Sequence, residues 1–212
     1  MPNNPLLTGL CWLLAPGRCA GCDLPFDDAT HCVCEACEPL LEPTPAGLQP
    51  PRNSAAAYLY QGPLADAVRR FKYAQRTELA PYLGGLLART ALAYAGCVER
   101  VVPMPLHPAK LRARGYNPAA LLARYVAREL GVPLDVSLLS RLRATRNQAG
   151  LDREARARNV RGAFAARAGA KAARVLLLDD VRTTGATLAE AAAALSSHGH
   201  EVTTLALAWT PS

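Results

Sequence analysis

The sequence predicts an α/β fold with a mainly parallel sheet, preceded by a small metal-binding module. Two cysteine pairs with C-x-x-C spacing lie near the N-terminus, and apolar strand-like runs alternate with helical stretches after them. The last such alternation contains two adjacent carboxylates followed by a loop rich in threonine and glycine. Strands that alternate with helices along a chain are typical of parallel sheets.

Length and composition are those of a globular chain. The 212 residues suffice for one ordinary domain plus a small module, and half of them are hydrophobic. No apolar stretch approaches the roughly 18 residues that a membrane helix needs, so we expect no membrane span. No Lys or Arg precedes the apolar residues 6–15, which counts against an export signal. A short helix packed on the next module is expected there instead.

The first element is a cysteine module. Cys19-Ala-Gly-Cys22 and Cys34-Glu-Ala-Cys37 are separated by eleven residues, and two such knuckles can close a tetrahedral zinc site. Four thiolates leave no open coordination position, so Cys19, Cys22, Cys34 and Cys37 predict a structural Zn²⁺ in a zinc-ribbon-like module. Cys32 could replace Cys34 as a ligand, and a redox dithiol is a second alternative. Clustered cysteines favour a reducing, cytoplasmic location.

The next segments predict a linker and then the larger domain. Residues 43–51 are rich in proline and read as a stiff linker, so we expect a zinc module over 1–48 and a second domain over 52–212. Helices are predicted from Gln61 onward, over 79–95, and over 118–130 with Asn117 as N-cap. Short strands are predicted over residues 100–105, 138–142 and 162–166, and a loop over residues 106–117.

The C-terminal segment carries the clearest chemistry. Residues 174–178 predict a buried strand that ends at Asp179 and Asp180, followed by a turn, a helix over 186–198 and a strand over 201–209. Carboxylates there can accept hydrogen bonds from sugar hydroxyls, and the turn offers backbone N–H groups to a phosphate. In the alternative interpretation a threonine only caps the helix, but this leaves two adjacent carboxylates repelling each other. We therefore predict a site for a phosphorylated sugar.

The central part of the chain is strongly basic. Residues 100–167 hold fourteen Lys and Arg against four acidic residues, which indicates a polyanionic partner. The alternative is a set of solvated faces on which arginine replaces lysine, since the chain has only three lysines. Arg114 followed by Gly115 at a turn suits the binding of a pyrophosphate, or is simply part of a solvated basic loop. His107 is a weak general acid–base candidate, and Gln148 is a candidate contact to a ligand or base edge.

The run Asp-Asp-Val-x-Thr-Thr-Gly-x-Thr resembles the motif by which type I phosphoribosyltransferases bind phosphoribosyl pyrophosphate (PRPP). Preceding it in order are the cysteine knuckles, Arg70-Phe-Lys-Tyr73, Val-Pro-Met-Pro-Leu-His107, Arg114-Gly-Tyr-Asn117, Thr145-x-x-Gln148 and Arg158-Asn-Val160. With these segments nearly the whole chain resembles the ComF family of competence proteins. The resemblance implies a sheet of type I phosphoribosyltransferase type and PRPP bound with Mg²⁺. The residues implied to bind PRPP are Asp179, Asp180, Thr183, Thr184, Gly185, Ala186, Thr187, Arg114 and Gly115, with Asp179 and Asp180 also catalytic.

Two functions follow from these observations. The ComF resemblance implies a role in natural transformation, in the handling of imported single-stranded DNA, with other DNA-uptake or recombination proteins as candidate partners. Candidate stacking residues for DNA are Tyr58, Tyr60, Phe71, Tyr73 and Tyr116. The alternative is an active phosphoribosyltransferase that transfers the phosphoribosyl group of PRPP to a base or other acceptor in nucleotide metabolism. No segment specifies a particular base, so the sequence leaves open whether the chain is an enzyme.

Overall fold

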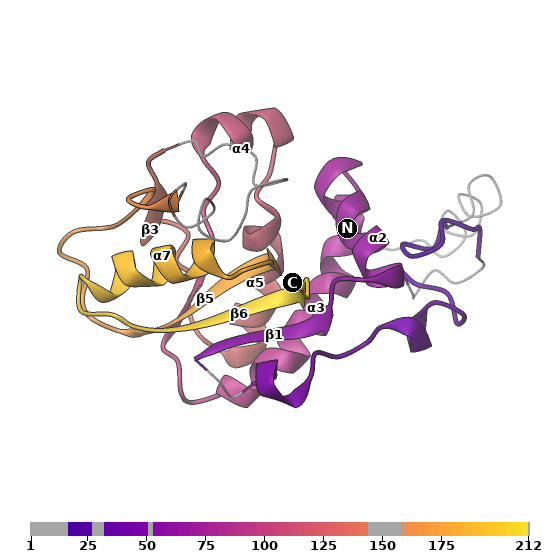
Figure 1. Ribbon diagram of the computed structural model, residues 1–212, viewed down its shortest axis with the longest axis horizontal. Coiled ribbons are helices and arrows are strands. Elements are labelled where there is room, and N and C mark those ends of the chain that lie inside the picture. Colours follow the sequence, from indigo (N-terminus) through magenta and orange to yellow (C-terminus); the bar gives the residue numbers. More distant parts are fainter. Residues whose placement is uncertain (1–16, 27–31, 51–52, 144–157, 159, 212) are drawn as a thin grey trace, which may run out of the picture.

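Four parallel strands form the central sheet of the computed structural model, in the order β1-β6-β5-β2 (Figure 1). They span Ser54–Leu59 (β1), Arg100–Pro103 (β2), Arg174–Arg182 (β5) and Glu201–Trp209 (β6). Two short strands, Leu139–Arg141 (β3) and Phe164–Ala166 (β4), pair antiparallel in a second sheet. The structure describes residues 17–26, 32–50, 53–143, 158 and 160–211. The predicted mainly parallel α/β fold is confirmed.

Helices cover both faces of the central sheet. The α-helices with described bounds are Gly62–Tyr73 (α2), Ala80–Ala91 (α3), Pro108–Arg114 (α4), Pro118–Leu130 (α5) and Ala186–Ser196 (α7). Leu176 and Leu178 of β5 pack in one core cluster with residues of α2, α3 and α5. Val175 and Leu177 pack in a second cluster with residues of α7, on the opposite face (Figure 1). The side chains of β5 thus alternate between two buried faces, as in other strands of parallel sheets.

Several predicted elements occur with the expected bounds. β6 spans 201–209, and α5 spans 118–130, with Asn117 Oδ1 accepting from the N–H of Ala119 at 3.1 Å. α2 carries the predicted proline in its first turn. The helix expected over 79–95 is α3, flanked by the 3₁₀ turns Thr77–Leu79 and Leu92–Tyr94. The apolar segment 6–15, Thr145 and Gln148 lie outside the described residues.

The loop predicted over residues 106–117 is wrong in part, because residues Pro108–Arg114 form α4. Pro108 presets the helical φ angle in the first turn, and His107 Nδ1 accepts from the N–H of Ala109 at 3.3 Å. Gly115 ends the helix with a left-handed φ of 84°, a conformation that glycine adopts without strain.

The cysteine module packs directly on the larger domain. Cys19, Ala20 and Cys37 belong to the same core cluster as residues of α2 and α3. The stretch expected to be a linker lies against β1, where Thr44 N–H donates to Ala57 O at 3.1 Å and Thr44 Oγ1 donates to Ala56 O at 2.5 Å. The two parts therefore share a core in the described residues, and the division into 1–48 and 52–212 stays a prediction. Within the same residues, no helix is both long and apolar enough to cross a membrane.

Candidate functional site

A cavity of about 440 Å³ lies beyond the carboxyl ends of β2 and β5. Parallel sheets commonly bind ligands at this edge. The predicted site residues that line the cavity are Asp179, Asp180, Thr183, Gly185, Thr187 and Arg114. The remaining predicted residues, Thr184, Ala186 and Gly115, are also described and adjoin these in the chain without lining the cavity. The fold thus brings Arg114 to the carboxylate pair across more than sixty positions of sequence.

The strand that carries the carboxylates is longer than predicted. β2 ends at Pro103, opposite Leu178, whereas β5 continues beside β6 to Arg182. Asp179 and Asp180 therefore lie within the last part of β5, with β6 on one side and the cavity where β2 has ended. The N–H of Asp180 donates to Asp179 Oδ1 at 2.9 Å, so a carboxylate takes the place of a strand partner.

The two carboxylates point to opposite faces of the strand. Asp180 follows the face of Leu178 toward α2, where Lys72 Nζ donates to its Oδ1 at 2.8 Å. Burial alone would lower the pKa of Lys72, but the Asp180 carboxylate raises it above its usual value. Burial and the neighbouring Asp180 charge raise the pKa of Asp179 to about 7. The charge of Asp179 therefore changes near neutral pH.

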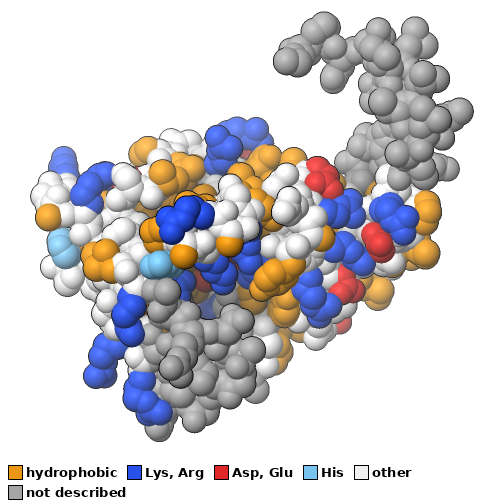
Figure 2. Space-filling model, turned by 90° about the horizontal axis from the view of Figure 1, so that it is seen from above, with side chains coloured by type: hydrophobic (Ala, Val, Ile, Leu, Met, Phe, Trp, Pro, Cys, Tyr) orange, Lys and Arg blue, Asp and Glu red, His pale blue; other side chains and the backbone are white. Residues whose placement is uncertain are grey.

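Cationic side chains surround this pair. Lys72, Lys110, Arg114 and Arg141 all line the cavity. The pKa of Lys110 is lowered by burial and by the positive charges of Arg114 and Lys72. Such mutual repulsion is relieved when an anion binds between the cations. Figure 2 shows Lys and Arg side chains spread over the face seen from above, with acidic side chains mainly toward its right-hand end.

The turn after β5 offers backbone donors to the same cavity. Gly185 caps α7 with a left-handed φ of 80°, and a Cβ atom there would lie 3.3 Å from Arg182 Nε. The N-cap residue Gly185 has no side chain to cap α7, and the N–H of Ala186 in the first turn donates to Thr184 Oγ1 at 3.5 Å. The N–H groups and dipole of this turn favour a bound anion.

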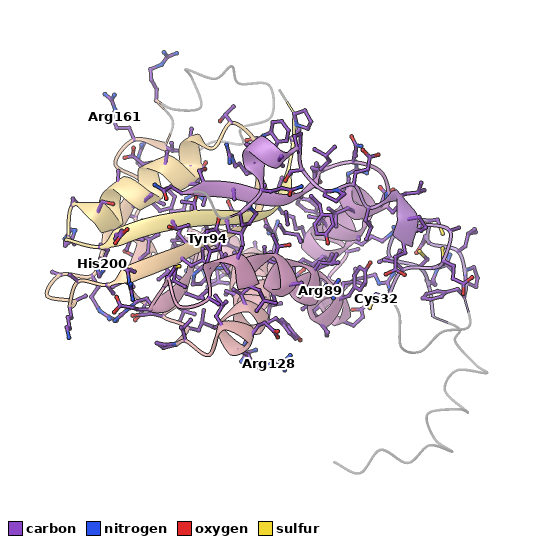
Figure 3. All side chains as sticks on the ribbon, turned by 90° about the horizontal axis from the view of Figure 1, so that it is seen from below. Cys32, Arg89, Tyr94, Arg128, Arg161 and His200 are labelled. Carbon is purple, nitrogen blue, oxygen red and sulfur yellow. The ribbon has the colours of Figure 1, made fainter. Side chains whose placement is uncertain are left out.

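The four predicted metal ligands converge at the far end of the molecule. The sulfur atoms of Cys19, Cys22, Cys34 and Cys37 all lie within 4.8 Å of one another. Cys32 lies outside this set and contributes its carbonyl oxygen to Ala20 N–H at 2.7 Å, which favours Cys34 over Cys32 as the ligand (Figure 3). Burial opposes ionisation of Cys19, yet N–H groups of Cys34, Cys22 and Gly21 lower its pKa to about 6. The cluster can hold a metal ion.

Three known relatives align with two thirds of the chain or more. DNA utilization protein YhgH of Escherichia coli (strain K12) is 30% identical over 217 residues, which are 90% of this chain and 92% of the relative. Its counterpart in Salmonella typhimurium is 30% identical over 88% of this chain and 94% of the relative. Competence protein F of Haemophilus influenzae is 33% identical over 67% of this chain and 66% of the relative. The chain belongs to the ComF family.

No family model matches the ComF chain. Among solved structures, adenine phosphoribosyltransferase from Thermoanaerobacter pseudethanolicus has a TM-score of 0.41 and 16% identity, over 81% of this chain and 84% of its own. The enzyme from Trypanosoma brucei, solved with AMP, pyrophosphate and ribose-5-phosphate, has a TM-score of 0.42 and 11% identity, over 82% and 78%. Structural similarities with TM-scores this low support no conclusion about the ComF chain.

Lys72 and Arg141 line the ComF cavity although the sequence did not predict a role for them, and Tyr73, predicted only as a stacking residue for DNA, lines it as well. Lys72 and Tyr73 belong to the Arg70-Phe-Lys-Tyr73 motif, which was the available signal. Of the five aromatic residues considered for stacking, Phe71 is fully buried, and the Tyr116 hydroxyl donates to the Phe71 carbonyl. Tyr73 is 71% exposed. His107 lines the cavity, and its Nδ1 atom caps α4.

Proposed function

We propose that this ComF chain binds PRPP with Mg²⁺ in the cavity beyond β5, and that it acts in natural transformation on imported single-stranded DNA. One observation carries the ligand assignment. A carboxylate pair, a helix N-terminus that begins after Gly185 and five cationic side chains meet around one cavity of about 440 Å³. A ribose with phosphates at both ends needs all three kinds of group.

Each residue has a proposed role in holding PRPP. Asp179 and Asp180 accept hydrogen bonds from the ribose hydroxyls, and the turn formed by Thr183, Thr184, Gly185, Ala186 and Thr187 surrounds the 5′-phosphate. Arg114 and Gly115 lie toward the pyrophosphate, assisted by Lys110. Carboxylate oxygens are donors that suit Mg²⁺, which would supply positive charge against the pyrophosphate oxygens. Before the ligand binds, the Lys72–Asp180 ion pair holds the Asp180 carboxylate in place.

Isothermal titration of the full chain with PRPP and ribose 5-phosphate, with and without Mg²⁺, tests this assignment. Asp180→Asn should weaken PRPP binding about tenfold or more, because hydrogen bonds to a charged acceptor are lost. Asp66→Asn is the matched control, since Asp66 pairs with Arg69 on the exposed side of α2 and does not line the cavity. Equal PRPP affinity of the two variants would contradict the assignment.

We also propose that the metal of the cysteine cluster is a structural Zn²⁺ held by Cys19, Cys22, Cys34 and Cys37. Four thiol donors suit zinc and leave no position for a substrate. Zinc supplies folding free energy to a module too small for a core of its own. The proposed location is the cytoplasm, where such thiols stay reduced.

The role in DNA handling is supported by the names of two relatives, a DNA utilization protein and a competence protein. The excess of positive charge over residues 100–167 also suits a phosphate backbone. The logarithm of the affinity for labelled single-stranded DNA should fall linearly with the logarithm of the salt concentration. The reason is that binding releases the counterions that surround the DNA phosphates. Binding that is absent or insensitive to salt contradicts a direct role of the chain, and competition by PRPP shows whether both ligands share the cavity.

Phosphoribosyl transfer is the second candidate function. The observation that favours it is the apolar part of the cavity wall, formed by Met104, Leu106 and Leu188 beside the charged groups. Such a wall can hold a planar acceptor and exclude water from the anomeric carbon. Release of pyrophosphate from PRPP, followed with a panel of bases, tests this activity. Turnover that Asp180→Asn leaves unchanged would contradict the catalytic role of the pair.

A further inference from the structure

Arg182 is a cationic side chain of the cavity that has no acidic partner. It is the last residue of β5, lines the cavity and occupies the variable position that follows Asp-Asp-Val in the motif. Lys72 is paired with Asp180 at 2.8 Å, whereas no carboxylate among the described residues forms an ion pair with Arg182. The family resemblance implies no role for a residue at a variable position, so any role of Arg182 comes from its own contacts.

The Arg182 guanidinium packs against the turn that precedes α7. Its Nε atom lies 3.3 Å from the point that a Cβ atom on Gly185 would occupy, and its Nη1 atom donates to the Ser54 carbonyl at 3.4 Å. The side chain therefore runs from the end of β5, along the turn, toward the start of β1. It fixes a positive charge beside the backbone N–H groups that are proposed to bind phosphate.

Part of this guanidinium is buried without compensation. The Nε atom is buried and has no hydrogen-bond partner among the described residues. Burial lowers the pKa of Arg182, and no neighbouring acid opposes that effect. Buried polar atoms usually have a partner, and a desolvated cation without a counter-charge costs folding free energy. An anion that enters the cavity would remove this cost.

We propose that Arg182 is a specificity-determining residue that makes the cavity select a phosphate monoester over a phosphodiester. This inference rests on the proposed function, because the 5′-phosphate must lie at the turn for Arg182 to attract it. A monoester carries close to two negative charges at neutral pH, and a diester carries about one. A fixed cation in a partly desolvated position therefore attracts the monoester more strongly. The cavity accordingly takes a free sugar phosphate, and the internal phosphates of a DNA strand bind elsewhere.

Calorimetric titration of the full chain with ribose 5-phosphate, the methyl ester of its phosphate, and inorganic phosphate tests the selection. The wild type should bind ribose 5-phosphate about tenfold more tightly than the methyl ester. Arg182→Met should bind ribose 5-phosphate and inorganic phosphate more weakly by the same factor, about tenfold, because the lost attraction acts on the phosphate. The methyl ester should lose less affinity. Arg182→Lys keeps the charge and should recover most of the affinity for ribose 5-phosphate.

Thermal stability gives a second readout. Arg182→Met removes an uncompensated cation, so the Tm of the ligand-free chain should rise by about 2–4 °C although ligand binding weakens. An arginine that only held the fold together would lower both the Tm and the affinity when replaced. Arg174→Met is the matched control, because Arg174 begins the same strand, pairs with Glu99 and does not line the cavity. It should leave the affinity for ribose 5-phosphate unchanged.

The outcomes separate the role of Arg182 from the proposed function. The selection is wrong, and the cavity assignment stands, if the methyl ester binds as tightly as ribose 5-phosphate or if Arg182→Met binds ribose 5-phosphate like the wild type. The same conclusion follows if Arg182→Lys binds as weakly as Arg182→Met, if Arg182→Met lowers the Tm, or if an oligonucleotide without a terminal phosphate displaces ribose 5-phosphate. If the wild type binds neither ribose 5-phosphate nor inorganic phosphate, the proposed function is wrong and the role of Arg182 is overturned with it.

Discussion

The surroundings of Asp179 change its ionisation strongly. Burial and Asp180 raise its pKa to about 7, while an Asp in an unfolded chain titrates near pH 3.9. Its Oδ1 atom accepts the N–H of Asp180, a contact that an asparagine oxygen can also make. Charge and hydrogen bonding at this position can therefore be changed separately.

Asp179→Asn should stabilise the ligand-free chain at pH 8 but not at pH 4. Between these values the folded wild type keeps a proton that the unfolded chain has released, so wild-type stability falls as the pH rises toward 7. The gain from the substitution should grow from near zero at pH 4 to about 1–3 kcal/mol at pH 8. Urea denaturation at both pH values measures it, and an equal difference at the two would contradict the shifted pKa.

The conformation of the turn that is proposed to bind phosphate depends on Gly185. Gly185→Ala should destabilise the chain by about 1–2 kcal/mol, because a left-handed φ of 80° strains any residue with a Cβ atom. The new methyl group would also press on Arg182, so ribose 5-phosphate should bind more weakly. Gly47→Ala is the control, since no atom lies within 4 Å of a Cβ there. If the two variants have the same Tm and the same affinity for ribose 5-phosphate, the turn tolerates alanine.

At the scale of elements, the last turn of α2 joins the two parts of the chain. Arg70 binds the first cysteine knuckle through Gly21 O, Lys72 binds Asp180, and Tyr73 supports Arg114. Three residues within one helical turn thus contact the cysteine module, β5 and α4. A displacement of this turn changes the cavity and the knuckle together.

Arg70→Met should therefore weaken ribose 5-phosphate binding several-fold although Arg70 does not line the cavity. It removes a charged donor from the carbonyl groups of Ala20 and Gly21, which should cost about 1–3 kcal/mol of unfolding free energy. Arg69→Met is the matched control, because Arg69 is an exposed neighbour that pairs with Asp66 three residues earlier. Calorimetry and urea denaturation compare the two, and the coupling is refuted if both variants bind equally.

Elements with strong local signals were predictable, and those without were not. α5 begins at an Asn–Pro cap, and β6 contains β-branched residues followed by the apolar run 205–209, so residues 117–130 and 201–209 were predictable from local sequence. β1 was missed because its core is three alanines, which have low β-propensity and become strand only through pairing with β6. α4 was taken for a loop because its seven residues bury no side chain and so show no apolar face.

For the molecule as a whole, the cysteine cluster and the cavity are parts of one packed structure. The knuckle residues Cys19 and Cys37 share a core with Leu64 and Phe71 of α2. Metal binding should therefore stabilise the larger domain as well as the small module. Thermal unfolding should be a single transition when the metal is bound.

Cys34→Ser should lower metal content from about one ion per chain and should lower Tm markedly, since one of four thiolates is lost. Cys32→Ser is the control, because Cys32 sits two residues away and outside the cluster. Elemental analysis and thermal melting of protein purified without chelator measure both effects. A larger loss of metal in Cys32→Ser would reverse the ligand assignment.

The packing of the whole molecule also explains which parts of the site could be predicted from the sequence. The cysteine knuckles and the Asp179–Asp180 turn are local patterns whose spacing predicts their chemistry. Lys72 reaches Asp180 from 108 positions earlier in the chain, and Tyr73 meets Arg114 only because α2 and α4 border one cavity. Such contacts depend on how the helices pack on the sheet, which periodicity within a segment does not specify.

The early end of β2 has a spectroscopic consequence. The amide proton of Asp180 is hydrogen-bonded to Asp179 Oδ1 rather than to a neighbouring strand. Its NMR chemical shift should therefore follow the ionisation of Asp179 through a pH titration with a midpoint near 7, and should change again when a ligand engages the carboxylate. The chain thus contains its own reporter, a single backbone resonance that reads the charge state of the cavity without any added label.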